Sequence, residues 1–251
     1  MVPLAEEILK TGRVTTVDGR RTVRLQSETS QQVCEFLKTL VVGTRARATL
    51  EVGLAFGVSA LFICEGLQEV GGQRHIAIDP NQTTQYQRIG LENLRRAGFG
   101  DLVEVREEAS YIVLPELAAT GLKLDFAYID GWHTFDYALL DFFYVDQMLR
   151  VGGTVAMDDC HFPSVHAACR YIATNRAYRV TGICEDHSPW QASLGGRTLR
   201  WCAKHSDVIR RMVRPRFYEP DEKLGFTPFT RCIAFEKMGE DTRTWDEHHE
   251  Y

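Results

Sequence analysis

The sequence predicts an α/β domain built on a mostly parallel, twisted β-sheet. An apolar run at 126–129 ends at Asp130, and a second run at 154–157 ends at Asp158 and Asp159. The residues between the two runs have helical spacing, so we expect a strand–helix–strand unit. Ligands of open parallel sheets bind outside the carboxyl ends of the strands, where these three aspartates would converge.

The composition indicates one globular domain and argues against several classes of protein. The chain has 251 residues, 44% hydrophobic and 25% charged, with a net charge of -5. This charge argues against a nucleic-acid partner, and the apolar runs are too short to span a bilayer. Because the N-terminus lacks a signal-peptide pattern, we expect a cytoplasmic protein without a membrane partner. Seven cysteines without a CxxC pair predict buried, reduced thiols rather than disulfides or a zinc site.

The N-terminal part is expected to form an extension, followed by the first elements of the main domain. Residues 1–29 are mixed and polar with glycine turn signals, and we expect a short hairpin at 14–23. The main domain is predicted to cover 30–237. Its first helix starts near Ser30, where the apolar spacing is helical, and its first core strand lies at 48–52.

A glycine turn joins this strand to the next helix, in the pattern Glu51-x-Gly53-x-x-x-Gly57-x-Ser59. Glycines let a ligand approach the backbone, and the free amides of a helix N-terminus favour an anion. The pattern differs from the GxGxxG of dinucleotide-binding turns. We interpret it as a nucleotide or carboxylate site, and the alternative is a tight turn that binds no ligand.

Polar residues also follow the next two predicted strands. The strand at 75–78 ends at Asp79, whose carboxylate could accept hydrogen bonds from both hydroxyls of a ribose. The alternative is that Asp79 caps the following helix, expected at 84–97. The strand at 102–106 leads to Ser110, which would meet an adenine edge at the mouth of the sheet or cap the helix that follows.

The remaining elements are predicted from apolar spacing. The crossover helix of the central unit is expected at 137–149. Its core contacts are expected to be Leu140, Phe143, Tyr144, Val145 and Met148. Further helices are predicted at 114–119 and 164–173, and further strands at 179–183 and 232–236. Residues 185–228 are irregular and are expected to form an insertion on the substrate side, whereas 238–251 is expected to be a frayed polar tail.

Together these motifs resemble those of class I S-adenosylmethionine-dependent methyltransferases. The resemblance covers about residues 30–175 and is strongest to the metal-dependent small-molecule O-methyltransferases, meaning the catechol group and the macrocin and novobiocin sugar enzymes. It implies a Rossmann-like, doubly wound, mostly parallel seven-stranded sheet with an antiparallel last strand. It also implies S-adenosylmethionine and a divalent metal, Mg2+ or Mn2+, as cofactors.

The resemblance assigns roles to individual residues. It places cofactor contacts at Glu51, Gly53, Gly57, Ser59, Asp79, Ser110, Asp130 and Trp132. It places the metal at Asp130, Asp158 and Asp159. His133 stands where the catechol enzymes have a catalytic lysine, and the segment from Asp158 to Ile172 is closer to the sugar-methylating branch, which argues against a simple catechol substrate.

The residue types also support a metal-assisted reaction without the resemblance. Mg2+ prefers oxygen ligands, and it could orient two substrate oxygens and lower the pKa of the reacting hydroxyl. His133 or His161 could then accept the proton, because an unperturbed imidazole titrates near pH ~6.5. Positioning of the two reactants would contribute most of the acceleration. The alternatives are that the paired aspartates only cap loops and that His133 is structural.

The sequence therefore predicts methyl transfer from S-adenosylmethionine to a hydroxyl of a small molecule. The rivals are a metal-independent methyltransferase, a dinucleotide-dependent oxidoreductase, and a non-catalytic sensor or scaffold that binds the cofactor. Residues 1–45 and 185–228 would choose the acceptor, and Arg197 and Arg200 would suit a polar or acidic one. A homodimer is possible, since dimers are common in the families that the chain resembles.

Overall fold

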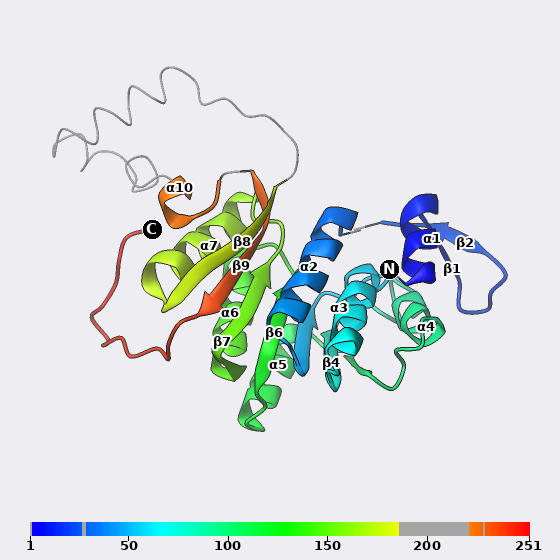
Figure 1. Ribbon diagram of the computed structural model, residues 1–251, viewed down its shortest axis with the longest axis horizontal. Helices are drawn as coiled ribbons and strands as arrows, with labels where there is room; N and C mark the ends of the chain where they lie inside the picture. Colours follow the sequence, from blue (N-terminus) through cyan, green and yellow to red (C-terminus); the bar gives the residue numbers. More distant parts are fainter. Residues whose placement is uncertain (1, 27–28, 186–220, 228) are drawn as a thin grey trace, which may run out of the picture.

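The computed structural model describes residues 2–26, 29–185, 221–227 and 229–251 (Figure 1). The helices are α1 (Pro3–Thr11), α2 (Gln31–Gly43), α3 (Val58–Glu69), α4 (Ile89–Arg96), α5 (Ser110–Ala119), α6 (Phe135–Met148), α7 (Pro163–Asn175) and α10 (Asp221–Leu224). The strands are β1 (Arg13–Thr15), β2 (Thr22–Arg24), β3 (Ala48–Val52), β4 (Arg74–Ile78), β5 (Val103–Arg106), β6 (Leu124–Ile129), β7 (Leu149–Met157), β8 (Tyr178–Glu185) and β9 (Thr230–Lys237).

The main sheet has seven strands in the order β5-β4-β3-β6-β7-β9-β8. The pairs from β5 to β7 are parallel, whereas β9 is antiparallel to both of its neighbours. This arrangement confirms the predicted Rossmann-like sheet with an antiparallel last strand. Because β9 runs against the others, its first residues lie at the edge where the parallel strands end.

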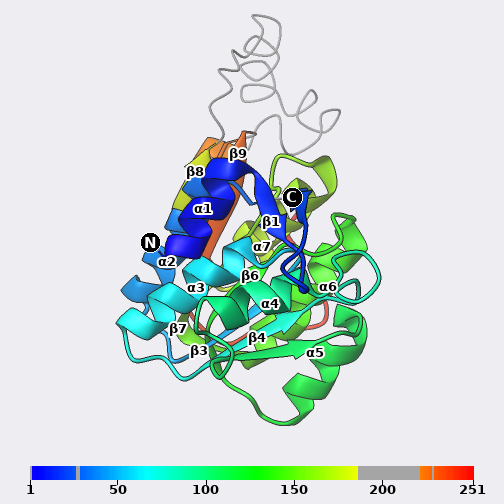
Figure 2. The same cartoon turned by 90° about the vertical axis from the view of Figure 1, so that its right-hand side faces the viewer.

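Helices cover both faces of the sheet (Figures 1 and 2). On one face, α5, α6 and α7 pack over alternate residues of the central strands, such as Val52, Ile129 and Met157. On the other face, α2 packs over Phe126 and Tyr128. The strands are thus buried on both sides, which explains why they are continuous apolar runs in the sequence.

The N-terminal segment packs against the main domain. The predicted hairpin is present as β1 and β2, but α1 had not been expected from the sequence. Ala5, Ile8 and Val14 belong to the same buried cluster as Leu54 and Phe56 of the glycine turn. Residues 2–26 therefore help to enclose the turn on which the cofactor prediction rests.

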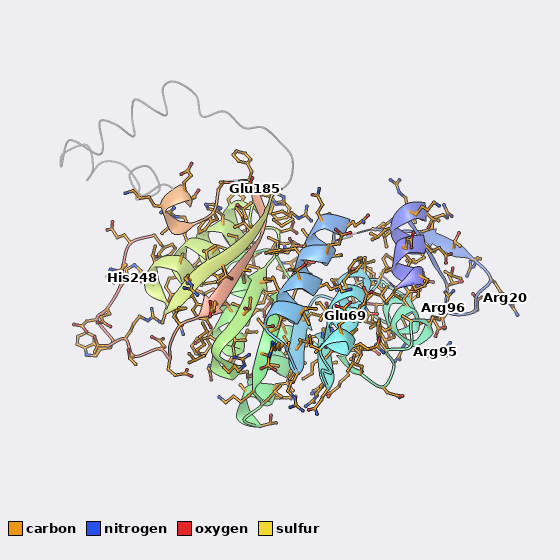
Figure 3. The ribbon with its side chains drawn as sticks, in the orientation of Figure 1. Arg20, Glu69, Arg95, Arg96, Glu185 and His248 are labelled. Carbon is orange, nitrogen blue, oxygen red and sulfur yellow. The ribbon has the colours of Figure 1, made fainter. Side chains whose placement is uncertain are left out.

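Charged side chains mark the outer surface at this end of the molecule. Figure 3 shows Arg20 on the hairpin and Arg95 and Arg96 on α4, all projecting outward. Arg95 pairs with Glu92 on the same helix, with 2.8 Å between the nitrogen and the oxygen. Exposed ion pairs of this kind contribute little to the stability of the fold.

Two helices begin at positions other than those predicted. The helix expected at 84–97 is reduced to α4, because the chain is in the left-handed region at Gln87 and Arg88 before the helix starts. The helix expected at 114–119 begins earlier, at Ser110, and contains Pro115. Ser110 is the first residue of α5 rather than its cap, so the N-cap alternative for this serine is wrong.

The predicted core face of α6 is wrong at two positions. Leu140 is 37% exposed and Phe143 is 46% exposed, whereas Val145 and Met148 are buried as expected. The buried stripe includes Asp141 and Asp146 next to Phe142. Because two aspartates lie on the inward face, the apolar pattern alone assigned the stripe to the wrong side of the helix.

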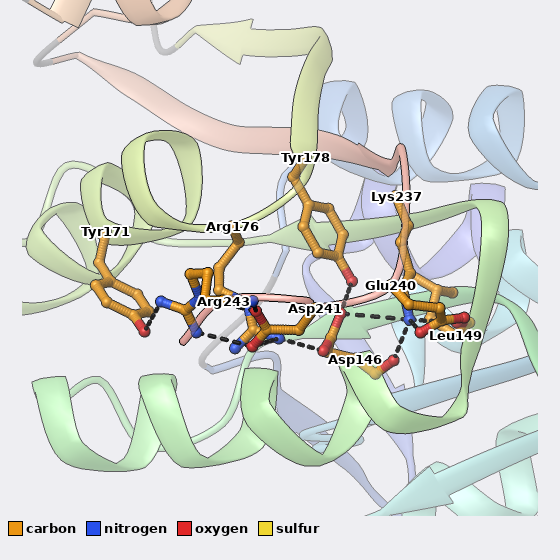
Figure 4. Close-up of polar contacts among 9 residues, drawn as sticks. All are labelled: Asp146, Leu149, Tyr171, Arg176, Tyr178, Lys237, Glu240, Asp241 and Arg243. Atoms are coloured by element: carbon orange, nitrogen blue, oxygen red, sulfur yellow. Dashed lines mark hydrogen bonds and ion pairs between the residues drawn. The ribbon is translucent and has the colours of Figure 1, made fainter. Parts of the chain in front are cut away.

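The C-terminal tail is held by polar contacts, although the sequence predicts that it is frayed. Arg176, just after α7, donates to Asp146 of α6, and its guanidinium also lies 3.2 Å from Asp241 of the tail (Figure 4). Further along, Asn175 exchanges two hydrogen bonds of 2.8 Å with the backbone of His249. These contacts tie residues 238–251 to α6 and α7, at the side of the sheet where β8 and β9 lie.

Two further sequence predictions concern burial and membranes. The prediction of buried thiols is confirmed for five cysteines, namely Cys34, Cys64, Cys160, Cys169 and Cys232. Cys202 lies outside the described residues. Among the helices that the structure describes, none has the length and apolar character needed to cross a membrane.

Candidate active site

The glycine turn after β3 is narrow because it passes close to the turn after β6. Gly53 has φ 96°, and a Cβ atom at this residue would lie 2.1 Å from the carbonyl oxygen of Asp130. Gly57 has φ 77° and immediately precedes α3. Only a residue without a side chain fits at Gly53, so the two turns can approach each other and frame the N-terminus of α3.

We expect Gly53→Ala to lower the free energy of unfolding by about 1–3 kcal/mol, the usual cost of forcing an extra atom into a packed site. The matched control is Gly98→Ala, since Gly98 also has a positive φ but its Cβ would meet no atom within 4 Å. Urea unfolding of both variants measures the difference. Equal losses would show that backbone conformation alone, and not the contact with Asp130, requires glycine at position 53.

A pocket opens between this turn and the N-terminal segment. It is lined by Leu25, Gln26, Thr29, Gly53, Leu54, Ala55, Phe56, Val58, Ser59 and Asp130. Three of the residues predicted to contact the cofactor, Gly53, Ser59 and Asp130, therefore share one pocket. The contribution of Leu25, Gln26 and Thr29 was not predicted, because no sequence pattern links that segment to the turn.

Glu51 lies beneath the pocket rather than in its lining. It is fully buried, and its Oε2 accepts a hydrogen bond of 3.1 Å from the Ser59 hydroxyl. Its Oε1 lies 3.4 Å from Nε2 of His75, whose Nδ1 is 2.8 Å from the Thr49 hydroxyl. Glu51 thus orients Ser59 at the start of α3.

Asp79 braces the glycine turn from the neighbouring strand. Its Oδ2 accepts hydrogen bonds from the backbone amides of Leu54 and Ala55, at 3.2 and 2.7 Å. The same oxygen accepts from Gln82 Nε2, and Oδ1 accepts from the amide of Asn81. The carboxylate therefore fixes the shape of the turn, whether or not it also meets a ribose.

The three aspartates predicted at the sheet edge come together there. Asp130 follows β6, and Asp158 and Asp159 follow β7, which is its parallel neighbour. The Tyr128 hydroxyl donates to Asp158 Oδ2 at 2.6 Å, and Asp130 Oδ2 lies 3.3 Å from the same hydroxyl oxygen. Asp159 has φ 52°, in the left-handed region, a strain that non-glycine residues usually carry at functional sites.

Arg231 reaches the same carboxylates from β9. Its Nε lies 3.1 Å from Asp159 Oδ1 and 3.4 Å from Asp158 Oδ1. The backbone explains its place, because the carbonyl oxygen of Arg231 accepts a hydrogen bond from the amide of Cys160. The sequence did not indicate this arginine, since it lies more than 70 residues after Asp159 and begins an antiparallel strand.

Two histidines flank Asp159. His133 Nε2 lies 3.3 Å from its Oδ2, and His161 Nδ1 lies 3.8 Å from its Oδ1. Both imidazoles contact the ring of Phe162. Asp130, His133 and Asp159 each offer a ligand atom, and these atoms lie within 4.8 Å of one another.

The pKa values show how strongly these groups interact. Burial raises the pKa of Asp130 well above its usual value, and the charges of Asp158 and Asp159 raise it further. Burial also raises the pKa of Asp158, against the hydrogen bond from Tyr128. The pKa of Arg231 is raised, since the nearby carboxylates outweigh the opposing effect of burial. One guanidinium thus does not offset the burial and mutual repulsion of these carboxylates, and a further cation beside them would favour their ionised forms.

The other predicted site residues, Ser110 and Trp132, follow β5 and β6 at the same edge of the sheet. Ser110 opens α5 and is 8% exposed, while Trp132 is 68% exposed at the mouth of the site. Near Ser110 lies Asp141 of α6, a buried carboxylate that the sequence analysis assigned to no role. Its only sequence signal was a charged residue in the apolar stripe of the crossover helix.

Known proteins resemble this chain in sequence over about half of its length. A family model described as a methyltransferase domain matches residues 50–160. Tricin synthase 2 of Oryza sativa subsp. japonica is 30% identical over 132 residues, which is 50% of this chain and 42% of that protein. Catechol O-methyltransferase of Mycobacterium tuberculosis is 29% identical over 140 residues, 52% of this chain and 61% of that protein. The chain thus spans about half the length of these relatives.

The solved structures agree on the architecture. An O-methyltransferase from Bacillus cereus in complex with SAH superposes with a TM-score of 0.58 and 22% identity, covering 73% of this chain and 84% of that one. The fold is therefore one that this O-methyltransferase shares, and residues 50–160 match a methyltransferase domain in sequence. This confirms the resemblance that the sequence motifs indicated.

Proposed function

We propose that this protein transfers the methyl group of S-adenosylmethionine to a hydroxyl of a small molecule, with a divalent metal ion at the sheet edge. The observation that supports this most is the convergence of Asp130, His133 and Asp159 beside the pocket of the glycine turn. The relatives named as O-methyltransferases support the choice of an oxygen acceptor. Location in the cytoplasm and a homodimer remain predictions.

The residues of the pocket fit the methionine part of the cofactor. The N-terminus of α3 is suited to a carboxylate, and Ser59 adds a hydroxyl that Glu51 orients. The absence of a side chain at Gly53 lets the turn after β6 approach, so that Asp130 lines the same pocket. Asp79 and Ser110 are proposed to meet the ribose and the adenine, and Trp132 to flank the cofactor.

The donor set at the sheet edge fits a hard cation such as Mg2+ or Mn2+. Asp130, Asp158 and Asp159 are proposed as its ligands, and Asp130 and Asp159 offer their oxygens most directly, since Tyr128 and Arg231 hold Asp158. A bound divalent ion would supply Lewis acidity that lowers the pKa of the acceptor hydroxyl. His133 is proposed to take the proton of that hydroxyl at Nε2, with His161 as its reserve.

Calorimetric titration tests the metal assignment directly. S-adenosylmethionine is titrated into EDTA-treated protein, and Mg2+ or Mn2+ is then titrated into that complex. We expect Asp159→Asn and Asp130→Asn to weaken metal binding by more than about tenfold, because each removes an ionised ligand. The control is Asp101→Asn, an exposed carboxylate remote from the carboxyl edge, which should leave the metal affinity unchanged.

One observation favours a second candidate function, a metal-independent methyltransferase. The guanidinium of Arg231 lies against two of the three proposed ligands and could serve as the resident cation of the site. Cofactor binding without metal binding, together with turnover that survives EDTA, would establish this reading. In that case Arg231→Met should lower turnover, whereas in the metal-dependent reading it should tighten metal binding by removing a competing cation.

The acceptor itself is proposed only as a class. The residues expected to select it, including Arg197 and Arg200, lie outside the described residues. The open end of the described site carries exposed rings, Trp132 and Phe162, beside His133 and His161. This surface would suit an acceptor that presents a ring next to its reactive hydroxyl.

A further inference from the structure

Asp141 is a buried carboxylate with one donor nearby, the Ser110 hydroxyl. It is 1% exposed, and neither of its oxygens has a hydrogen-bond partner of normal geometry in the described part of the chain. Two residues lie next to its carboxylate, Gly131 and Ser110. A Cβ atom on Gly131 would lie 3.2 Å from Asp141 Oδ2, and the Ser110 hydroxyl is the group whose hydrogen bonding favours the ionised form. The carboxylate thus lies between the turn after β6 and the first turn of α5.

This arrangement is costly for a residue with only a structural role. Leaving a buried acceptor without a donor costs about 1–3 kcal/mol. Asparagine or leucine could fill the same volume of α6 without a buried charge. A buried, unpaired polar group in a native protein calls for an explanation, and at the edge of a binding site a missing ligand donor is the simplest one.

The position of Asp141 relative to the pocket indicates which part of the cofactor it could meet. The pocket of the glycine turn lies at the N-terminus of α3, on one face of the sheet. Ser110 and Asp141 belong to α5 and α6, on the other face. A cofactor whose methionine end lies at α3 and which passes over the turns of Gly53 and Asp130 at the carboxyl edge would bring its far end to these two residues.

We propose that Asp141 accepts a hydrogen bond from the exocyclic amino group of the adenine, next to Ser110, and so selects an adenosyl cofactor. A carboxylate can only accept, which matches an amino group, and the Ser110 hydroxyl would then turn from Asp141 and donate its proton to a ring nitrogen. A 6-oxo purine would instead place an acceptor against the carboxylate. The proposal rests on the proposed function, because it requires S-adenosylmethionine to bind at this edge.

The test compares two ligands on the full-length protein by calorimetry. The probes are S-adenosylhomocysteine and S-inosylhomocysteine, which differ by an amino or an oxo group on the purine. We expect the wild type to bind the adenosyl compound more than about 30-fold more tightly, since the other analogue leaves the carboxylate facing an acceptor. Asp141→Ala should reduce this ratio to about threefold or less. Asp141→Asn should also reduce it, because an amide can donate to the oxo group.

The control variant is Asp136→Asn, an exposed aspartate in the first turn of the same helix, which should keep the wild-type ratio. Thermal unfolding of each variant confirms that it is folded before it is titrated. An unchanged ratio in both Asp141 variants, with S-adenosylhomocysteine still binding, would overturn this proposal and leave the proposed function intact. Absence of S-adenosylhomocysteine binding to the wild type would overturn both.

Discussion

Replacing His133 with alanine is expected to lower kcat by about 10²- to 10⁴-fold, the range associated with loss of a general base. Its Nε2 lies 3.3 Å from Asp159 Oδ2, so the carboxylate can orient the imidazole and stabilise its protonated form. The His133 side chain is 40% exposed, which leaves it accessible to an acceptor. The rate is measured with a hydroxylated acceptor found by screening catechols and sugars, the acceptors of the two enzyme groups that the motifs resemble.

His161→Ala serves as the comparison for this experiment. His161 is similarly exposed but lies farther from Asp159, at 3.8 Å, so we expect its loss to lower kcat by less than about tenfold. His133→Lys should restore part of the rate, because a lysine can also accept the proton when its pKa is lowered. Metal titration of His133→Ala separates two roles: a base changes kcat alone, whereas a ligand also changes the metal affinity. Equal losses in both alanine variants would rule out His133 as the specific base.

The strands of the sheet were predictable because burial on both faces makes each one a short apolar run. The run at 48–52 coincides with β3, and those at 126–129 and 154–157 fall within β6 and β7. Each run ends at an acid or a glycine, which marks the carboxyl edge. The N-terminal helix α1 escaped prediction because it is only nine residues long and buries only Ala5 and Ile8.

The site was predictable only where it follows a strand in sequence. Asp130, Asp158 and Asp159 come directly after apolar runs, so parallel pairing brings them together. Arg231 was missed because its place depends on the antiparallel pairing of β9 with β7. Tyr128 was counted as part of an apolar strand, although its hydroxyl bridges two of the aspartates. Side chains that reach the site from distant segments leave no local pattern.

The mistaken face of α6 has a different origin. Apolar spacing predicted an inward stripe through Leu140 and Phe143, whereas the helix buries Asp141 and Phe142. A charged residue on the buried stripe breaks the rule that this stripe is apolar. Natural proteins break such rules mainly at functional positions. The failure of the prediction at Asp141 is therefore in line with a role in binding, and it implies a measurable cost in stability.

That cost should appear as a pH-dependent gain in stability when Asp141 is replaced by asparagine. Burial raises the pKa of Asp141 from 3.8 to about 6, while Ser110 acts in the opposite direction. Between about pH 4 and pH 6, Asp141 is therefore protonated in the folded state but ionised in the unfolded state. The stability that this proton supports is complete below pH ~4 and is lost as the pH rises through about 6. Above that pH, folding must bury an ionised carboxylate.

Asp141→Asn removes the ionisation, so the difference in unfolding free energy between variant and wild type should be near zero at pH 4. It should grow to at most about 3 kcal/mol in favour of the variant at pH 8, from a shift of about two pKa units at ~1.4 kcal/mol each. Urea unfolding across this range gives the difference curve, in which the titrations of other groups cancel. A flat curve would mean that Asp141 finds a donor in solution. A rising curve, together with weaker binding of S-adenosylhomocysteine, would mean that the protein keeps an unstable charge because its cofactor needs it.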